Sequence, residues 1–225
     1  MTQEIGQVFK NSLIFSGLGE EELGELAALA ARRRLAPEEF VFWEGDAPDF
    51  FYLVLRGRVK VVKQSPTGKE FIVSFFGPGE MFGEVAVFEN KPYPASSVAA
   101  EETVVASIRR TAFLAFLAAH PEIALKIISV LGGRLREAQA RLGDLAASRV
   151  QQRIARVLLM LAARMGKDLP FTRREIADMT GTTIETAIRV LSRLGQGKII
   201  RSARGHIIIT DEQKLRLLAE GPPRV

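Results

Sequence analysis

The hydrophobic pattern of this chain changes its period partway along the sequence, and this change limits the folds that it can adopt. From about Phe40 to Ile108, short runs rich in β-branched and aromatic residues are separated by glycine and proline. After Pro121, apolar residues recur instead at alternating spacings of 4 and 3, which is the heptad period of a helix. The sequence therefore predicts an α+β fold in which a β domain precedes a long helix.

The β region is built from short strands that end at turns. Residues 51–63 hold two such runs on either side of Arg56-Gly57, which predicts two strands joined at a tight bend. Many short strands at this spacing favour a jelly-roll or a barrel. Helical patterns flank the region at residues 20–33 and 121–147.

A jelly-roll also suits metal-dependent cupin enzymes, which need clustered His and acidic ligands inside the barrel. The chain has two His, His120 and His206, and both lie outside the predicted strands. No Ser-His-Asp set and no suggestive pair of carboxylates stands out. We therefore expect no catalytic site and no metal site. The sequence contains no Cys, which excludes a Cys-held iron–sulfur cluster, whereas haem ligation by His120 stays open.

Charge is distributed unevenly. Residues 148–225 hold 15 Lys and Arg against 7 Asp and Glu, whereas residues 1–147 hold 16 against 19. A basic C-terminal third suits a module that binds a polyanion. No stretch of about 18 residues is free of charge, and Glu4 stands where a signal peptide would be apolar. These features predict a cytoplasmic protein without a membrane partner.

The helix over residues 121–147 carries an apolar seam over three heptads, which suits a two-stranded parallel coiled coil. The seam consists of Ala124, Ile128, Leu131, Leu135, Ala138, Leu142 and Leu145. A helix that packs on its own barrel is the alternative, but the strict period favours a homodimer. The sequence does not decide the role of Gly132, Gly133 and Gly143.

The C-terminal third contains the pattern of a helix-turn-helix. An amphipathic helix over residues 150–164 and a linker over 166–170 come first. Thr172, three residues before Glu175, forms a capping-box motif that starts a helix at Arg173. Gly181 ends that helix and Thr183 starts a second one. The apolar set expected to pack between the helices is Ile176, Ala187, Val190, Leu191 and Leu194.

The opposite face of the second helix suits recognition of DNA bases. Arg189 can donate twice to guanine, and Glu185 can accept from cytosine, although the two side chains can also pair with each other. Residues 198–201 and 206–210 predict a two-stranded wing. The predicted DNA contacts are Arg173, Arg174, Thr183, Ile184, Glu185, Thr186, Arg189, Lys198, Arg204 and His206.

Residues 76–88, here called the cassette, resemble the phosphate-binding cassette of cyclic-nucleotide-binding domains. The resemblance implies that backbone N–H groups around Gly83 hold a phosphate and that Glu84 takes a ribose hydroxyl. Members that bind nucleotide follow this with an Arg-Ser pair, but Tyr93 and Pro94 stand at those positions. The family's two adenine-contacting positions fall on Ala138 and Gln139. We therefore expect a different effector, or none, in place of cyclic AMP bound in the usual way; the candidate pocket is Gly83, Glu84, Tyr93, Pro94, Ala95, Ala138 and Gln139.

Taken in order, the jelly-roll, the long helix and the winged helix-turn-helix resemble the CRP/FNR family of transcription regulators. The resemblance implies a sensor domain (residues 1–120), a dimerisation helix (121–147) and a DNA-binding domain (148–225), with RNA polymerase as a partner. At Ile184 the FNR branch is also apolar, which implies a palindrome of TTGAT-type half-sites because an apolar side chain favours a thymine methyl. Two alternatives remain: a nucleotide-binding regulatory subunit whose winged helix binds protein, and a cyclic AMP-responsive activator with an atypical pocket.

Overall fold

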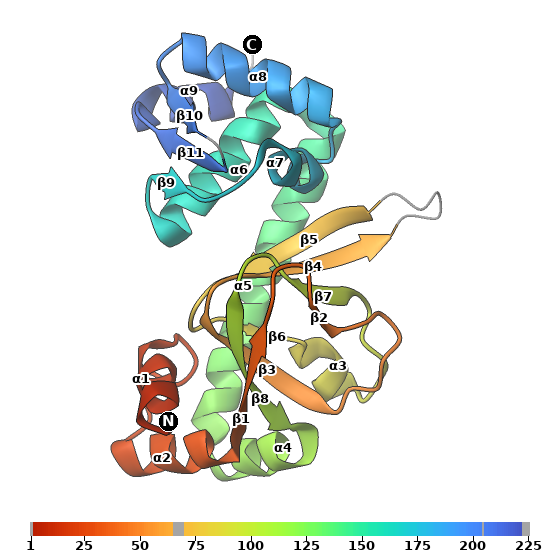
Figure 1. The fold of residues 1–225 in the computed structure, drawn as a ribbon, viewed down its shortest axis with the longest axis vertical. Coiled ribbons are helices and arrows are strands. Elements are labelled where there is room, and N and C mark those ends of the chain that lie inside the picture. Colours follow the sequence, from red (N-terminus) through yellow and green to blue (C-terminus); the bar gives the residue numbers. More distant parts are fainter. Residues whose placement is uncertain (1, 65–69, 204, 222–225) are drawn as a thin grey trace. The chain divides into compact units, whose positions relative to one another are not determined.

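The computed structural model describes residues 2–64, 70–203 and 205–221 (Figure 1). The chain forms two compact units, Met1–Leu135 and Arg136–Val225, called here the first and second unit. The long helix α5 (Pro121–Ala147) crosses from one unit to the other. The three domain boundaries drawn from the sequence stay a prediction, since this division falls within α5.

Two antiparallel four-stranded sheets form the jelly-roll of the first unit, as the sequence predicts. One sheet has the order β1-β8-β3-β6 and the other β2-β7-β4-β5. The strands are β1 (Ala30–Leu35), β2 (Phe40–Phe42), β3 (Phe50–Arg56), β4 (Val59–Gln64), β5 (Glu70–Phe76), β6 (Met81–Phe82), β7 (Ser96–Ala99) and β8 (Thr103–Arg109).

The predicted bend at Gly57 is confirmed, and it carries the chain from one sheet to the other. β3 and β4 lie on either side of it but belong to different sheets. Gly57 has φ +78, and a Cβ there would lie 2.5 Å from the carbonyl oxygen of Glu102. Only glycine satisfies both conditions, because a side chain would be strained and would collide with backbone.

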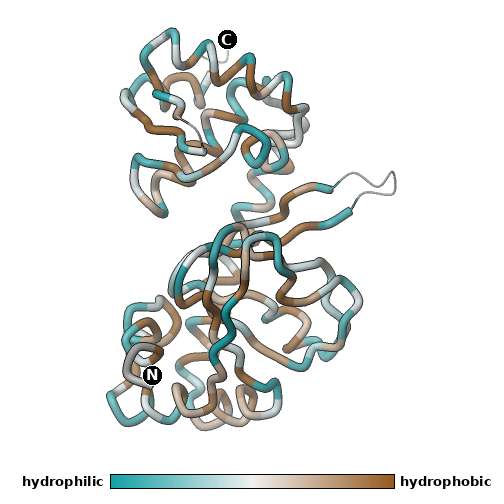
Figure 2. The backbone as a smooth tube through the Cα atoms, in the orientation of Figure 1, coloured by the Kyte–Doolittle hydropathy of each residue, from teal (hydrophilic) through white to brown (hydrophobic). Residues whose placement is uncertain are grey.

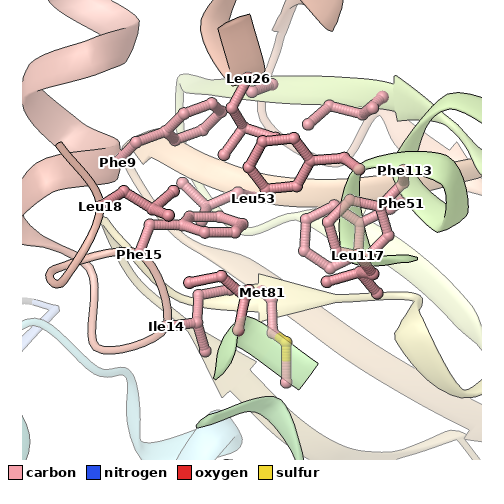
Figure 3. Packing of buried hydrophobic residues seen from close by; sticks show 14 of the residues in the cluster. Phe9, Ile14, Phe15, Leu18, Leu26, Phe51, Leu53, Met81, Phe113 and Leu117 are labelled. Atoms are coloured by element: carbon pink, nitrogen blue, oxygen red, sulfur yellow. The ribbon is translucent and has the colours of Figure 1, made fainter. Parts of the chain in front are cut away.

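Helices cover one end of the jelly-roll and share a core with it. These are α1 (Thr2–Asn11), α2 (Glu20–Leu29), α4 (Arg110–Ala119) and the first half of α5, while α3 (Glu84–Glu89) follows β6. Figure 3 shows this core, in which the rings of Phe51 and Phe113 stack with centroids 3.8 Å apart. Side chains from both helices and strands are therefore buried together in one hydrophobic cluster, and a second cluster that includes Phe42, Tyr52 and Tyr93 lies in the same unit.

The helix predicted over residues 20–33 is wrong at its C-terminal end. The helix ends at Leu29, and Ala30–Leu35 forms β1, which pairs along its whole length with β8. Arg33 then reaches the carbonyl oxygens of Phe40 and Val41 at 2.8 and 2.9 Å. The pairing partners lie 68 to 78 residues away along the chain, so local periodicity carried no sign of this strand.

Within the described residues, no single helix is long and apolar enough to cross a membrane. The helices α4 and α5 meet these criteria only when they are taken together, and a bend of 111° separates them.

The second unit packs its helices against a small antiparallel sheet of order β10-β11-β9. The helices are α6 (Val150–Met165), α7 (Arg173–Thr180), α8 (Ile184–Gln196) and α9 (Glu212–Glu220); the strands are β9 (Asp168–Leu169), β10 (Ile200–Ala203) and β11 (His206–Ile209). The two-stranded wing is confirmed in β10 and β11, but the predicted linker 166–170 contains β9. Leu169 pairs with Ile207 and is fully buried, so this segment belongs to the core.

Candidate functional site

The helix-turn-helix forms as the capping motif predicts. Thr172 Oγ1 accepts the N–H of Glu175 at 3.2 Å, and the Thr172 N–H donates to Glu175 Oε2 at 2.7 Å. This reciprocal pair satisfies two N–H groups that the first turn of α7 would otherwise leave open. Arg173 and Arg174 follow directly and are exposed on that first turn.

The turn between the two helices is held from inside the second unit. Gly181 adopts φ +63, and the buried hydroxyl of Thr180 donates to the carbonyl of Ile176 at 2.7 Å. From α6, Arg153 donates to the carbonyl oxygens of Thr180 at 3.2 Å and Ser148 at 3.0 Å. The sequence did not suggest this role for Arg153, because its partner lies 27 residues away.

The second helix, α8, separates its residues sharply into two faces. Figure 2 shows hydrophobic and hydrophilic residues alternating along it. Its N-terminal Thr183 accepts the N–H of Thr186 at 3.3 Å. The predicted apolar set is confirmed as buried, namely Ile176, Ala187, Val190, Leu191 and Leu194. On the opposite face, Glu185 and Arg189 are exposed, while Ile184 and Thr186 are partly buried.

A concave surface lies beside this exposed face. Its lining includes Phe171, Arg173, Arg174, Ile184, Ile188 and Ala203. It therefore brings together α7, α8 and the wing, three elements that the sequence assigned separately to DNA contact. Ile188 is 37% exposed and was not among the predicted site residues. The sequence did contain a sign of it, because an apolar residue stands beside Arg189 on the polar face.

The wing residues have mixed surroundings. Lys198 is exposed just beyond α8 at φ +55, and His206 Nδ1 lies 3.0 Å from Asp168 Oδ1 on the neighbouring strand. The predicted contact Arg204 lies outside the described residues. Lys198 and His206 thus stand at opposite ends of the wing strands.

In the first unit, the cassette is filled by aromatic rings. Gly83 has φ +77 before α3, and a Cβ there would lie 3.2 Å from a ring carbon of Tyr93. Tyr93 is 3% exposed and stacks on Phe42 with ring centroids 3.7 Å apart. Its hydroxyl donates to the carbonyl of Phe50 at 2.6 Å. The residue at the family's Arg position therefore lies directly over the glycine of the cassette.

The acidic residue of the cassette is paired within the chain. Glu84 is 5% exposed, and its Oε1 accepts from Arg134 of α5 at 2.8 Å. Arg134 also donates to the carbonyl of Met81 at 2.7 Å and lies 4.6 Å from the ring centroid of Phe76. The sequence contained a sign that Arg134 faces the first unit. Arg134 continues the series Ile123, Ile127 and Val130, whose spacing places them on one face of the helix.

Burial raises the pKa of both Tyr93 and Tyr52 above the usual range of a phenol. The cause is loss of solvation, which penalises the phenolate form. Both hydroxyls therefore stay protonated at neutral pH, as the donor role of Tyr93 requires.

The remaining pocket candidates are dispersed. Ala95 is buried, and the carbonyl of exposed Pro94 accepts from Lys63 at 2.9 Å. Ala138 and Gln139 are exposed on α5 in the second unit, and their assignment to the pocket stays a prediction.

The long helix presents an exposed apolar stripe. Leu125, Ile128, Leu135 and Leu142 are 60–68% exposed, and Ala138 is exposed as well. Leu131, by contrast, packs partly buried against the core of the first unit, beside Ile127. It is less available to a partner helix than Ile128, Leu135, Ala138 and Leu142 are. The side chain of Leu145 lies outside the described residues.

One mixed cluster lies away from both sites. Glu22, His120 and Glu122 have ligand atoms within 4.8 Å of one another. His120 Nδ1 lies 3.5 Å from Glu22 and 3.6 Å from Glu122, distances that suit ion pairs. Glu22 also accepts the N–H of Gly19 at 2.6 Å, so part of the cluster serves to cap α2.

Comparison with known proteins agrees with this arrangement. The family model for the cyclic nucleotide-binding domain matches residues 32–120, and that for the Crp-like helix-turn-helix domain matches 152–218. The Cyclic AMP receptor protein of Thermus thermophilus is 33% identical over 214 residues, covering 94% of this chain and 99% of that protein. The CRP-like cAMP-activated global transcriptional regulator of Mycobacterium tuberculosis is 31% identical over 222 residues, covering 93% and 97%.

A solved structure shows the same fold. FixK2 from Bradyrhizobium japonicum superposes with a TM-score of 0.77 at 25% identity, covering 84% of this chain and 96% of that one. The jelly-roll, the long helix and the winged helix-turn-helix thus occur together in relatives of matching length. The chain belongs to the CRP/FNR family of DNA-binding transcription regulators.

Proposed function

We propose that this protein is a homodimeric regulator that binds a palindromic DNA site of the TTGAT type. The observation that carries the proposal is α8, a capped helix whose buried face is apolar and whose exposed face holds Glu185 and Arg189. Side chains four apart on one helix face project together, so both reach base edges in one major groove. Arg189 would donate to guanine, Glu185 would accept from cytosine, and Ile184 would contact a thymine methyl.

Phosphate contacts would come from residues around this helix. They are Arg173, Arg174, Thr183, Thr186, Lys198, Arg204 and His206. Cations and hydroxyl groups at such positions fix the register of a protein on the duplex without recognising sequence. RNA polymerase would be the partner through which bound protein affects transcription.

The exposed stripe on α5 supports a homodimer. Four large apolar side chains on one exposed helix face would be buried by the same face of a second copy. A two-fold symmetric dimer matches a palindrome, since each half-site then meets one helix-turn-helix.

The sensor would not respond to cyclic AMP in the family's usual way. The ring of Tyr93 lies over Gly83, and Glu84 is already paired with Arg134. A cyclic phosphate would lose the cationic partner that the Arg position supplies, at a cost of about 1.5–3 kcal/mol. The second candidate, a cyclic AMP-responsive activator with an atypical pocket, is favoured by the names of the relatives and by the retained Gly83-Glu84 pair.

Two measurements on the whole chain of 225 residues test the proposal. Affinity for a duplex with two TTGAT half-sites should exceed that for a scrambled duplex and fall steeply with salt, because bound phosphates release counterions. Weak binding that is insensitive to salt would contradict DNA recognition and favour a protein-binding winged helix. Calorimetric titration with cyclic AMP should show no micromolar binding; clear heat of binding would favour the second candidate.

A further inference from the structure

Ile188 is a large apolar residue on the exposed face of the recognition helix, and none of the contacts proposed above uses it. It is 37% exposed and follows Ile184 by one turn of α8. Single exposed apolar residues are common on protein surfaces and need no explanation. Ile184 and Ile188, however, lie next to each other and line the same concave surface.

The lining of this concave surface combines apolar and cationic groups. Ile184, Ile188 and Ala203 contribute apolar atoms, whereas Arg173 and Arg174 contribute charge. Both arginines are exposed, and the capping box at Thr172 holds the turn that carries them. An apolar floor beside two guanidinium groups would suit a ligand that presents a methyl group next to an anion.

A thymine-bearing DNA strand has this combination. The C5 methyl of thymine is the apolar group on the major-groove edges of the four base pairs. In the pyrimidine ring, C5 lies on the side nearer to its own sugar–phosphate strand, so each methyl is close to a phosphate. Residues four apart are displaced by about 6 Å along a helix, and stacked base pairs by about 3.4 Å. A displacement of about 6 Å corresponds to between one and two base-pair steps, so two isoleucines one turn apart fit thymines that are adjacent or one base pair apart.

We infer that Ile184 and Ile188 together recognise the methyl groups of two thymines that are adjacent or one base pair apart on one strand of each half-site. Ile188 is then a specificity-determining residue, and Arg173 and Arg174 hold phosphates of the same strand. This inference rests on the proposed DNA-binding function and assigns it a second apolar contact. The positive charge of Arg173 and Arg174 argues for nucleic acid as the occupant of the concave surface, in preference to an apolar peptide.

The test replaces thymine with uracil, which removes the methyl group and leaves base pairing unchanged. The full-length protein is first used to select its preferred sequence from a random duplex library. The affinity for the selected duplex is then measured with uracil at each thymine of the half-site. Removal of one recognised methyl should weaken binding about three- to fourfold, and removal of both about tenfold. Uracil at thymines in the flanking sequence serves as the control and should change nothing.

Alanine variants assign each methyl to its residue. Ile188→Ala should abolish the preference for thymine over uracil at one position, and Ile184→Ala at the other. Leu217→Ala is the matched control, because Leu217 is an apolar residue on α9 that is 63% exposed. It should keep both preferences.

The outcomes separate this inference from the function on which it rests. A selected site without two thymines that are adjacent or one base pair apart on one strand, or equal affinity for thymine and uracil duplexes, overturns the inference while sequence-specific binding stands. Failure to enrich any sequence overturns the proposed function and the inference with it.

Discussion

The polar side chains of the two candidate sites differ in their exposure to solvent. In the helix-turn-helix, Arg173, Arg174 and Arg189 are exposed to solvent. Glu84 of the cassette and Tyr93 beside it are at most 5% exposed; Glu84 pairs with Arg134, and the Tyr93 hydroxyl donates to the carbonyl of Phe50. The proposed DNA-binding surface therefore exposes these three charges to solvent, whereas Glu84 and Tyr93 bond to groups inside the chain.

This difference bears on how each site would bind. A ligand in the cassette would have to move a stacked ring and replace an ion pair, and both changes cost free energy before any new contact forms. DNA on α8 would meet side chains that need only reorient. The protein thus combines an exposed surface that suits an external partner with a cassette whose Gly83 and Glu84 contact other side chains of the same chain.

The largest expected effect comes from breaking the internal pair of the cassette. Arg134→Ala should lower the free energy of unfolding of the first unit by about 2–4 kcal/mol, because it leaves the buried carboxylate of Glu84 without a partner. The chain has 1 Trp, Trp43, so denaturant unfolding followed by its fluorescence reports on the first unit. The double variant Glu84→Gln with Arg134→Met is the control and should recover part of the loss. An unchanged unfolding midpoint for Arg134→Ala would show that the pair contributes little.

The next effect concerns the exposed site. Arg189→Ala should weaken binding to the TTGAT duplex by about 1–3 kcal/mol, the range for a bidentate contact with guanine. Fluorescence anisotropy at fixed salt measures this change. Arg193→Ala, on the same helix and also exposed, should weaken specific and scrambled duplexes equally. If Arg189→Ala behaved in this non-specific way too, Arg189 would not recognise a base.

A change of specificity, rather than a loss of affinity, is expected at Ile184. Ile184→Arg should shift preference at one position of the half-site from thymine to guanine by about 1–2 kcal/mol, since the guanidinium donates to guanine O6 and N7. Competition between duplexes that differ at that position measures the shift. A preference that stays with thymine would argue against contact between residue 184 and a base.

The smallest effect concerns the ring of Tyr93, which lies against Gly83 of the cassette. Tyr93→Phe should destabilise the first unit by about 1 kcal/mol through loss of the hydrogen bond to Phe50. Because the pKa of Tyr93 is raised in the folded state, the unfolded chain releases the phenolic proton first, and stability falls as pH rises above about 10. The stability of the variant should therefore fall less steeply with rising pH. Part of the decline should remain, because Tyr52, the other of the 2 Tyr, also has a raised pKa. Identical slopes for both proteins would contradict the burial of an un-ionised Tyr93.

The helix-turn-helix was predictable almost residue by residue because its determinants are local. A capping residue, its partner three positions later and a glycine at the helix end are neighbours in sequence, and α7 begins and ends where they predict. The bend at Gly57 was predictable for the same reason. Two of the missed elements, β1 and β9, are strands whose hydrogen bonds go to distant segments. The helices α1, α3, α4 and α9 were not predicted either, so non-local pairing explains only part of what was missed.

The candidate effector pocket was predictable only in part. The departure at Tyr93 was visible in the sequence, but the position of its ring over Gly83 and against Phe42 was not. The pairing of Glu84 with Arg134 joins residues 50 positions apart, and no periodic pattern links a cassette to a helix that follows it. Because of these contacts, the presence of Tyr93 at the family's Arg position also affects the neighbouring residues of the candidate pocket.

By itself, the sequence determined the α+β organisation, the basic C-terminal third and the two faces of the recognition helix. These properties depend on composition, on periodicity and on hydrogen bonds within a few residues. The tertiary structure alone decided that Tyr93 lies against Gly83, that Arg134 pairs with Glu84, and that Arg173 and Arg174 lie beside Ile184 and Ile188. Helical spacing shows which residues share a face, but it does not show which other segment packs against that face.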